Sequence, residues 1–319
     1  GRDIMRKILL ASTALVAFGT VAANAADVTI SGATDWHYIN YDNTSNSGAL
    51  NGSYIDMDQD VDFKFSTTTD SGLTLTMGVG LDEGGNTDDQ YFDIAGDFGT
   101  LRLSNDLEGL ADSAMDESVA DNMTTLAPGL AMHGGDLDNN TIMYTLPSMS
   151  GLTLKVHHQD GGATTKGDNT AFLAEYSADM SGGSVKAQYI SSSTDDTGAS
   201  GNQSGTDSTS MGLRFTLSDF QVTASQHTKS INTNAYDYKN DVIDVKYTGI
   251  EGISISAFTL SGGDDKNTSY DFNQSAASIT YTIASGLTAS VSMTDSEVTT
   301  SAGVKSNDDA TVLNIKATF

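Results

Sequence analysis

The sequence predicts an all-β fold, namely a 16-stranded antiparallel transmembrane β-barrel. Apolar and polar residues alternate with a period of two along most of the chain, and the connections between alternating segments are short and long in turn. Side chains on a strand point to opposite faces, so this alternation produces one apolar and one polar face. Only 38% of the residues are hydrophobic, against roughly 45–50% in ordinary soluble domains. A barrel with a wet interior has no ordinary core to fill, which accounts for this low content.

The N-terminal 25 residues have the features of a secretory signal peptide. Met5-Arg6-Lys7 opens a basic region, a 16-residue mostly apolar run covers 8–23, and Ala23-Asn24-Ala25 places small residues where signal peptidase reads. The alternative is a membrane anchor, but a spanning helix needs roughly 20 apolar residues. Residues 1–4 precede the start Met and resemble a leader scar. We therefore expect cleavage after Ala25 and a mature barrel over 26–319.

Sixteen alternating segments follow the signal peptide. In the third of them, Leu73, Leu75, Met77, Val79 and Leu81 alternate with threonine and glycine, as expected for a strand with one lipid-facing side. The segments lie near 27–42, 53–69, 72–82, 89–97, 100–105, 139–147, 151–159, 169–179, 183–192, 208–218, 219–228, 239–248, 252–261, 273–284, 286–296 and 309–319.

The connections alternate in length, seven being short and eight longer and rich in Asp, Asn, Ser, Thr and Gly. Short turns on one rim and long loops on the other are typical of an up-and-down outer-membrane barrel. A soluble β-sandwich is the first alternative, but it gives no steady alternation of loop length. A calcium-binding β-helix is the second, but its nine-residue glycine–aspartate repeat is absent.

The basic residues obey the same alternation. Lys64, for example, lies between Phe63 and Phe65. Such a cation points away from lipid, where it would cost roughly 2–4 kcal/mol at mid-bilayer. Each lies three to five residues from a short turn or the C-terminus, so we expect a basic belt in the lower lumen, unless each position is a separate packing accident. The seven cations are Lys64, Arg102, Lys155, Lys186, Arg214, Lys246 and Lys316.

A run of alternate aspartates marks the second segment. On a strand all of them share the lumen face, near the extracellular end. The run faintly resembles a calcium-binding loop, but Val61 replaces the required Gly, and Thr67 stands where the bidentate Glu belongs. Three interpretations of the run remain open: a ladder in the vestibule that attracts cations, a structural cation site, or a set of ordinary solvated charges. The aspartates are Asp56, Asp58, Asp60 and Asp62.

The longest connection covers 106–138 and is strongly acidic. No Lys or Arg occurs between Arg102 and Lys155. A loop this long in a compact domain calls for a functional explanation, so we favour a segment folded into the barrel over a solvated surface loop. Its candidate constriction residues are Asp106, Glu108, Asp112, Asp116, Glu117 and Asp121.

Three features resemble the Gram-negative porins, especially the alphaproteobacterial general-diffusion porins. Residues 96–103 read GDFGTLRL, residues 139–154 read NNTIMYTLPSMSGLTL, and Phe319 resembles the family's aromatic C-terminal assembly signal. The resemblance implies a homotrimer of sixteen-stranded barrels in the bacterial outer membrane, each with its third long loop folded into the pore. It also implies contact with outer-membrane lipid and lipopolysaccharide, and insertion by the barrel assembly machinery.

The expected function is a passive aqueous channel for small hydrophilic solutes and ions. Acidic and basic groups across a narrow aperture create a transverse field, which orders water and hinders apolar solutes. The mature chain carries 12 − 41 = −29 charges, so we expect cation preference. The alternative is a substrate-selective, plugged or adhesive barrel.

Other functions find no support in the sequence. The net charge of −27 excludes a generic nucleic-acid binder, and the lack of Cys excludes disulfides, thiolate metal sites and Cys nucleophiles. His157 and His158 are neighbours on a strand and face opposite sides, so they cannot share a metal. HExxH, GxSxG and phosphate-loop motifs are absent. We expect neither an enzyme nor a cofactor, leaving open a structural cation such as calcium.

Overall fold

The computed structural model describes residues 26–43, 52–82, 84–85, 87–106, 109–115, 140–161, 167–195, 205–231, 236–264, 266, 270–299 and 302–319. These residues form a closed barrel in which each strand pairs with its neighbours in sequence, and β1 pairs with β16. The predicted sixteen-stranded antiparallel barrel is therefore confirmed. The predicted signal peptide, 1–25, lies outside the described residues.

The strands agree closely with the alternating segments. Among the differences, β4, β10, β12, β14 and β16 begin earlier than predicted, because near these ends the side chains are mostly polar and the period-two signal fades while backbone pairing continues. β6 is shorter than the predicted 139–147. The strands are β1 (Asp27–Asn43), β2 (Gly52–Thr68), β3 (Thr74–Leu81), β4 (Thr87–Gly96), β5 (Gly99–Asp106), β6 (Thr141–Thr145), β7 (Leu152–Gln159), β8 (Asn169–Met180), β9 (Gly183–Thr194), β10 (Thr206–Leu217), β11 (Phe220–Ile231), β12 (Tyr236–Ile250), β13 (Ile253–Asp264), β14 (Asp271–Ala284), β15 (Leu287–Thr299) and β16 (Lys305–Thr318).

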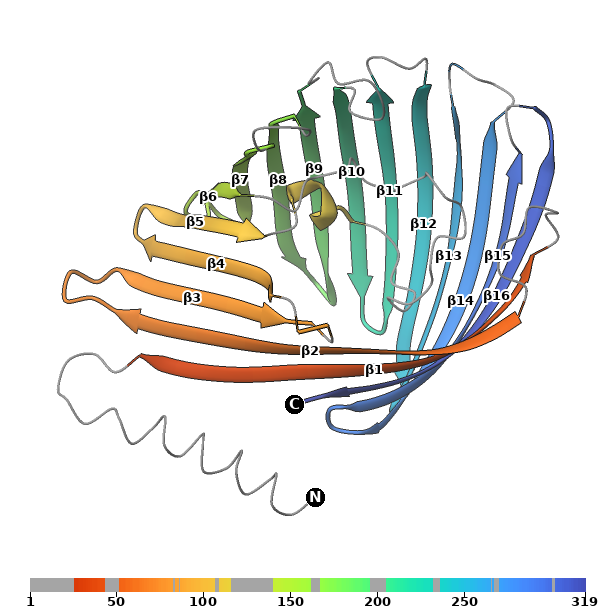
Figure 1. Ribbon diagram of the computed structural model, residues 1–319, viewed down its shortest axis with the longest axis horizontal. Coiled ribbons are helices and arrows are strands. Elements are labelled where there is room, and N and C mark those ends of the chain that lie inside the picture. The colour runs from red at the N-terminus through yellow and green to blue at the C-terminus, as the bar shows by residue number, and fades with distance from the viewer. Residues whose placement is uncertain are drawn as a thin grey trace.

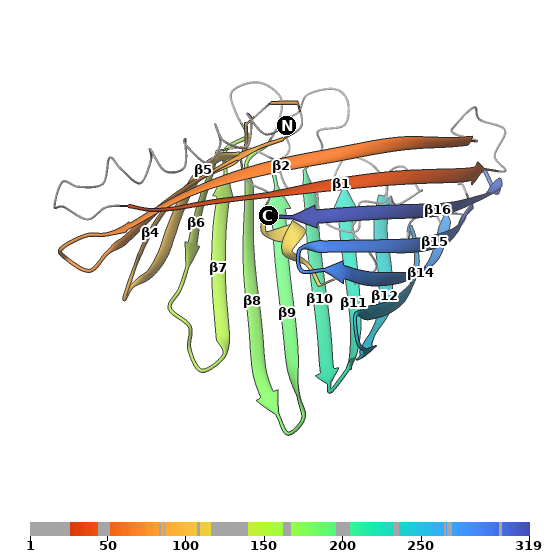
Figure 2. The same ribbon diagram turned by 90° about the horizontal axis from the view of Figure 1, so that it is seen from below.

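The walls of the barrel are inclined to one another. Figures 1 and 2 show β7–β10 running across the direction of β1, β2 and β16, as expected when strands tilt by 35–45° and opposite walls are seen together. A short 3-10 helix, η1 (Leu110–Ser113), lies beside β8 and β9. No helix among the described residues is long and apolar enough to cross a bilayer.

Tight turns close one rim of the barrel. The turns after β8, β12 and β14 each consist of two residues, the second being Gly182, Gly252 or Gly286 with φ of 85°, 72° and 73°. Glycine adopts this left-handed conformation without a Cβ penalty. The sequence pattern of a polar residue followed by glycine therefore determines where these hairpins reverse.

Burial identifies the inner and outer faces. Along β14, Phe272 and Gln274 are buried, whereas Ile279 and Tyr281 are 51% and 53% exposed. Even-numbered positions of this strand thus face inward, and the ladder register extends this assignment to neighbouring strands. Large apolar side chains that face outward include Ile142, Val156, Phe172, Met211, Leu213, Phe215, Ile243, Ile279, Met293, Leu313 and Ile315. They form the apolar belt that meets lipid.

The inner face is less uniformly polar than the alternation predicts. Val242, Phe258, Leu260, Phe272 and Ala276 form a buried cluster on β12–β14, and they lie at inward positions in the register. The alternation in the sequence identifies the inner face of a strand only where that face is polar and the outer face is apolar. Around Leu260 and Phe272 the inward positions are apolar while both outward neighbours are polar, so the expected polarity is reversed. Val242 and Phe258 each have one apolar outward neighbour as well, so the alternation is lost there.

Candidate functional site

All seven predicted belt cations occupy inward positions. Lys186 of β9 lies opposite Arg214 of β10 in the strand register, and Arg214 in turn lies opposite Thr223 of β11, which is fully buried. Lys316 faces Asp35 on β1, and Lys64 faces Thr29 on the same face of that strand. The cations come from β2, β5, β7, β9, β10, β12 and β16, so they are distributed around the barrel instead of lining one wall.

Arg102 is the most constrained of these cations. Its Nε and Nη2 donate to the two carboxylate oxygens of Asp93 on β4, at 2.7 and 2.8 Å. Its guanidinium also lies 4.0 Å from the centre of the Tyr91 ring, and that ring covers Gly78, where a Cβ would collide with it. A bidentate pair combined with a stacked ring holds the planar guanidinium in one orientation.

Two further cations have carboxylate partners on adjacent strands. Lys186 Nζ lies 3.0 Å from Glu175 Oε1, and Lys316 Nζ lies 2.8 Å from Asp35 Oδ2. Each pair leaves little net charge facing the lumen. The sequence interpretation missed Asp35, Asp93 and Glu175, although each occupies an inward position of its alternating segment.

Lys64, Lys155 and Lys246 differ from these paired cations. Within the described ranges, no ion pair joins any of the three to a carboxylate. They lie on β2, β7 and β12, so successive lysines around the closed barrel are five, five and six strands apart. Three lysines spread around the wall form a ring of positive charge instead of a one-sided cationic wall.

The aspartate run faces the lumen with these lysines. Asp56, Asp58, Asp60 and Asp62 are opposite inward positions of β1, with Asp58 opposite Asp35. Asp58 is half exposed, as expected beside a water-filled space. In the described part of the chain, no group of three or more His, Asp or Glu side chains has an arrangement that could hold a metal ion.

Buried His37 links the aspartate run to the belt. Its Nε2 lies 3.2 Å from Asp58 Oδ2, and its Nδ1 lies 3.2 Å from the Asn314 amide nitrogen. The same amide donates to Asp35 Oδ1 at 2.8 Å, and Asp35 pairs with Lys316. An amide nitrogen only donates, so Nδ1 acts as the acceptor in its contact with Asn314, whereas Nε2 lies close to Asp58 without a hydrogen bond.

The beginning of the longest connection lies on the inner wall of the barrel. Gln188 of β9 accepts a bond from Met115 N at 2.8 Å and donates to Ser113 O at 2.9 Å. Leu110 N donates to His157 Nδ1 at 3.2 Å, and Leu110 packs with Leu173 of β8.

The predicted constriction acids are only partly covered by the structure. Asp106 ends β5 and Asp112 lies within η1, but the side chains of both are outside the description. Glu108, Asp116, Glu117 and Asp121 lie outside the described residues.

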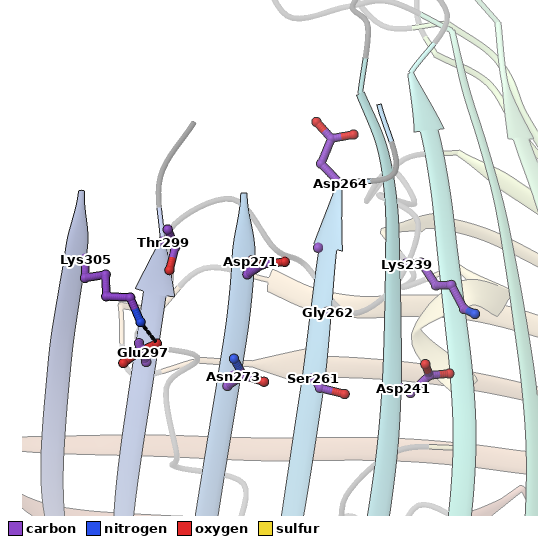
Figure 3. A pocket seen from close by; sticks show the side chains of 11 residues that line it. Lys239, Asp241, Ser261, Gly262, Asp264, Asp271, Asn273, Glu297, Thr299 and Lys305 are labelled. Carbon is purple, nitrogen blue, oxygen red and sulfur yellow. Dashed lines mark hydrogen bonds and ion pairs between the residues drawn. The ribbon is translucent and has the colours of Figure 1, made fainter. Parts of the chain in front are cut away.

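A polar hollow lies on the outer face, above the apolar belt. It has a volume of about 640 Å³, and its lining includes Lys239, Asp241, Asp271, Glu297 and Lys305. Figure 3 shows these side chains along β12–β16, with Lys305 Nζ 2.7 Å from Glu297 Oε1. Asp241 and Ile243 share the outward face of β12, and Ile243 is 57% exposed. This hollow therefore lies outside the lumen and off the transport path.

Structural comparison finds similar closed barrels among porins. An anion-selective porin from Comamonas acidovorans matches with a TM-score of 0.66 and 11% identity, over 92% of this chain and 100% of that chain. A trimer form of OmpT, an outer-membrane protein of Vibrio cholerae, matches with a TM-score of 0.68, 12% identity and the same coverage. A triple mutant of the Rh. blastica porin matches with a TM-score of 0.63 and 15% identity, again over 92% and 100%.

The family comparison covers nearly the whole chain. No curated protein matches the chain at the sequence level. The family model described as Gram-negative porin matches residues 11–319, a range that contains all sixteen strands and the residues facing the lumen. The chain therefore belongs to the Gram-negative porin family, which consists of outer-membrane channel proteins and not of enzymes.

Proposed function

We propose that this porin is a general-diffusion channel for small hydrophilic solutes and ions, with a preference for cations. The observation that carries the proposal is the ladder of exposed, inward-facing carboxylates at Asp56, Asp58 and Asp60. A ring or row of lumenal carboxylates attracts cations and raises their local concentration. Ion pairs to Arg102, Lys186 and Lys316 weaken the opposing positive belt.

We further propose that the connection 106–138 narrows the pore. The inner-wall position of residues 109–115 supports this, because Gln188 and His157 hold that segment inside the barrel. The acidic residues that follow, Asp116 and Glu117 among them, would add negative charge at the constriction. In this arrangement the acidic groups of the connection face the ring of lysines across the pore. Solutes are then filtered by size and charge, without a chemical step or a resident cofactor.

Reversal potential in a KCl gradient tests cation preference. The native channel should show a cation-selective potential, and the variant Asp112→Asn/Asp116→Asn/Glu117→Gln should shift it towards zero. An outward-facing control, Asp241→Asn, should leave it unchanged, because that carboxylate faces away from the lumen. Unchanged selectivity in the triple variant would mean that the acidic connection lies outside the pore. An anion-selective native channel would overturn the proposed cation preference.

We also propose a homotrimer that contacts lipid and lipopolysaccharide, after export with cleavage at Ala25 and insertion by the barrel assembly machinery. Outward positions of β3 are apolar over its whole length, with Leu75, Met77 and Val79, and such a face suits contact between subunits as well as lipid. Steady conductance that changes in steps of three supports this assembly. A particular similarity to the alphaproteobacterial porins stays a prediction, as does the binding of a calcium ion at the aspartate run.

A substrate-selective barrel is the second candidate. The inner-wall position of residues 109–115 also suits this candidate, because a segment held inside the barrel can narrow the pore enough to select one solute class. Block of the current by micromolar concentrations of one class of solute supports this candidate. Conductance that falls smoothly with solute size supports general diffusion.

A further inference from the structure

The lumen is electrostatically asymmetric along its axis. From the end with the long connections down to the middle of β2, the described inward-facing charges are five carboxylates and one lysine. The carboxylates are Asp56, Asp58, Asp60, Asp264 and Asp308, and the lysine is Lys229. This extracellular tier is therefore strongly negative.

The tier near the short turns is close to neutral. It holds the seven belt cations and seven described carboxylates at inward positions. Three of the carboxylates form the ion pairs of Arg102, Lys186 and Lys316. Asp62 and Asp244 stand two residues above Lys64 and Lys246 on the same faces. The remaining two, Asp27 and Asp179, lie at the rim.

We propose that this axial charge step makes the channel rectify, with higher conductance when the extracellular side is positive. Under that voltage, cations enter through the negative tier and pass into the neutral tier. Anions move the opposite way, meet the negative tier and accumulate at the junction, which draws in further cations and raises the local salt concentration. Reversed voltage depletes both ions there. The inference rests on the proposed channel function.

Residues of both tiers determine the effect, and they make opposite contributions to selectivity. Replacing Asp56, Asp58 and Asp60 by Asn removes the negative tier, so rectification and cation preference both fall. Replacing Lys64, Lys155 and Lys246 by Gln makes the lower tier negative as well, so rectification falls while cation preference rises. Conductance asymmetry caused only by pore shape would survive both triple variants.

The experiment is current–voltage recording of single channels with known orientation. The chain contains no Cys, so Ala302→Cys, at the exposed rim between β15 and β16, provides a unique site for biotin. Streptavidin added to one chamber reports which side holds the long connections. In about 0.1 M salt, where the Debye length is about 10 Å, we expect a conductance ratio of about two, falling to about one in 1 M salt, where it is about 3 Å.

The controls separate the possible failures. Lys239→Gln, on the outer face, should leave the current–voltage curve unchanged. Absence of any conductance would contradict the channel function itself. A conducting channel with a symmetric curve in low salt, or with the opposite sign, would overturn the inference alone. So would rectification that persists in 1 M salt or in either triple variant.

Discussion

At the scale of single residues, the lumen wall is shaped as much by small side chains as by charged ones. Tyr91 can cover the wall and stack with Arg102 only because residue 78 has no side chain. Asp93 then completes the site by binding the guanidinium from the same strand as the ring. Glycine at this inward position therefore serves close packing, and its φ is not in the left-handed region.

Gly78→Ala should destabilise the barrel because the new Cβ collides with the Tyr91 ring. Overpacking of this kind costs roughly 1–3 kcal/mol, measurable as a lower urea midpoint in unfolding from detergent micelles. Tyr91→Ala should remove most of that penalty when the two changes are combined, as a double-mutant cycle detects. Equal penalties from Gly78→Ala with and without the ring would contradict this packing.

At the scale of elements, the segment 109–115 is held by contacts from β7, β8, β9 and β10. Gln188 of β9 bonds two of its backbone groups, His157 of β7 bonds a third, and Gly212 of β10 leaves room for Met115. The beginning of the connection is thus anchored by polar and steric complementarity to the inner wall.

Gln188→Ala should loosen this anchor, because Met115 N and Ser113 O both lose their partner. Cleavage after Glu108 or Glu117 by a glutamate-specific protease should then become several-fold faster. Gln221→Ala is the matched control, since Gln221 also faces inward but pairs with Lys246 across β11 and β12. Similar cleavage rates for both variants would mean that Gln188 does not restrain the connection.

At the scale of the whole molecule, the last residue of the chain extends the ladder between β1 and β16 that closes the barrel. Phe319 N donates to Gly32 O at 2.9 Å, and Gly32 N donates back to Phe319 O. These backbone bonds join the C-terminus to β1, while the aromatic side chain is 84% exposed at the rim. An exposed aromatic ring there suits the girdle at the membrane interface.

Phe319→Ser should lower the fraction of folded, membrane-inserted barrel several-fold, whereas Phe319→Tyr should stay near the native level. Both variants keep the backbone bonds to Gly32, so the difference reports the aromatic side chain. The folded fraction is read from the shift in mobility between unheated and boiled samples on a denaturing gel. Equal folded fractions for the Ser and Tyr variants would mean that the aromatic ring has no role in folding or insertion.

Prediction from the sequence was most accurate for features that a single strand determines. A period of two determines which face of its own strand each residue occupies, so Lys64, Arg102 and Asp56 could be assigned to the lumen face without knowing any neighbour. Loop lengths then determined the order of the strands. The same reasoning failed for the inward cluster at Leu260 and Phe272, because apolar residues at inward positions reverse the pattern on which it relies.

By itself, the sequence determined the strand number, the up-and-down order and the lumen face of the seven belt cations and the aspartate run, since these depend on local periodicity and loop length. Only the tertiary structure decided which charges neutralise each other. The pairs of Lys186 with Glu175 and Lys316 with Asp35 depend on the register between strands and on barrel closure. The pair between Lys316 and Asp35 joins opposite ends of the chain, and no local pattern encodes that distance.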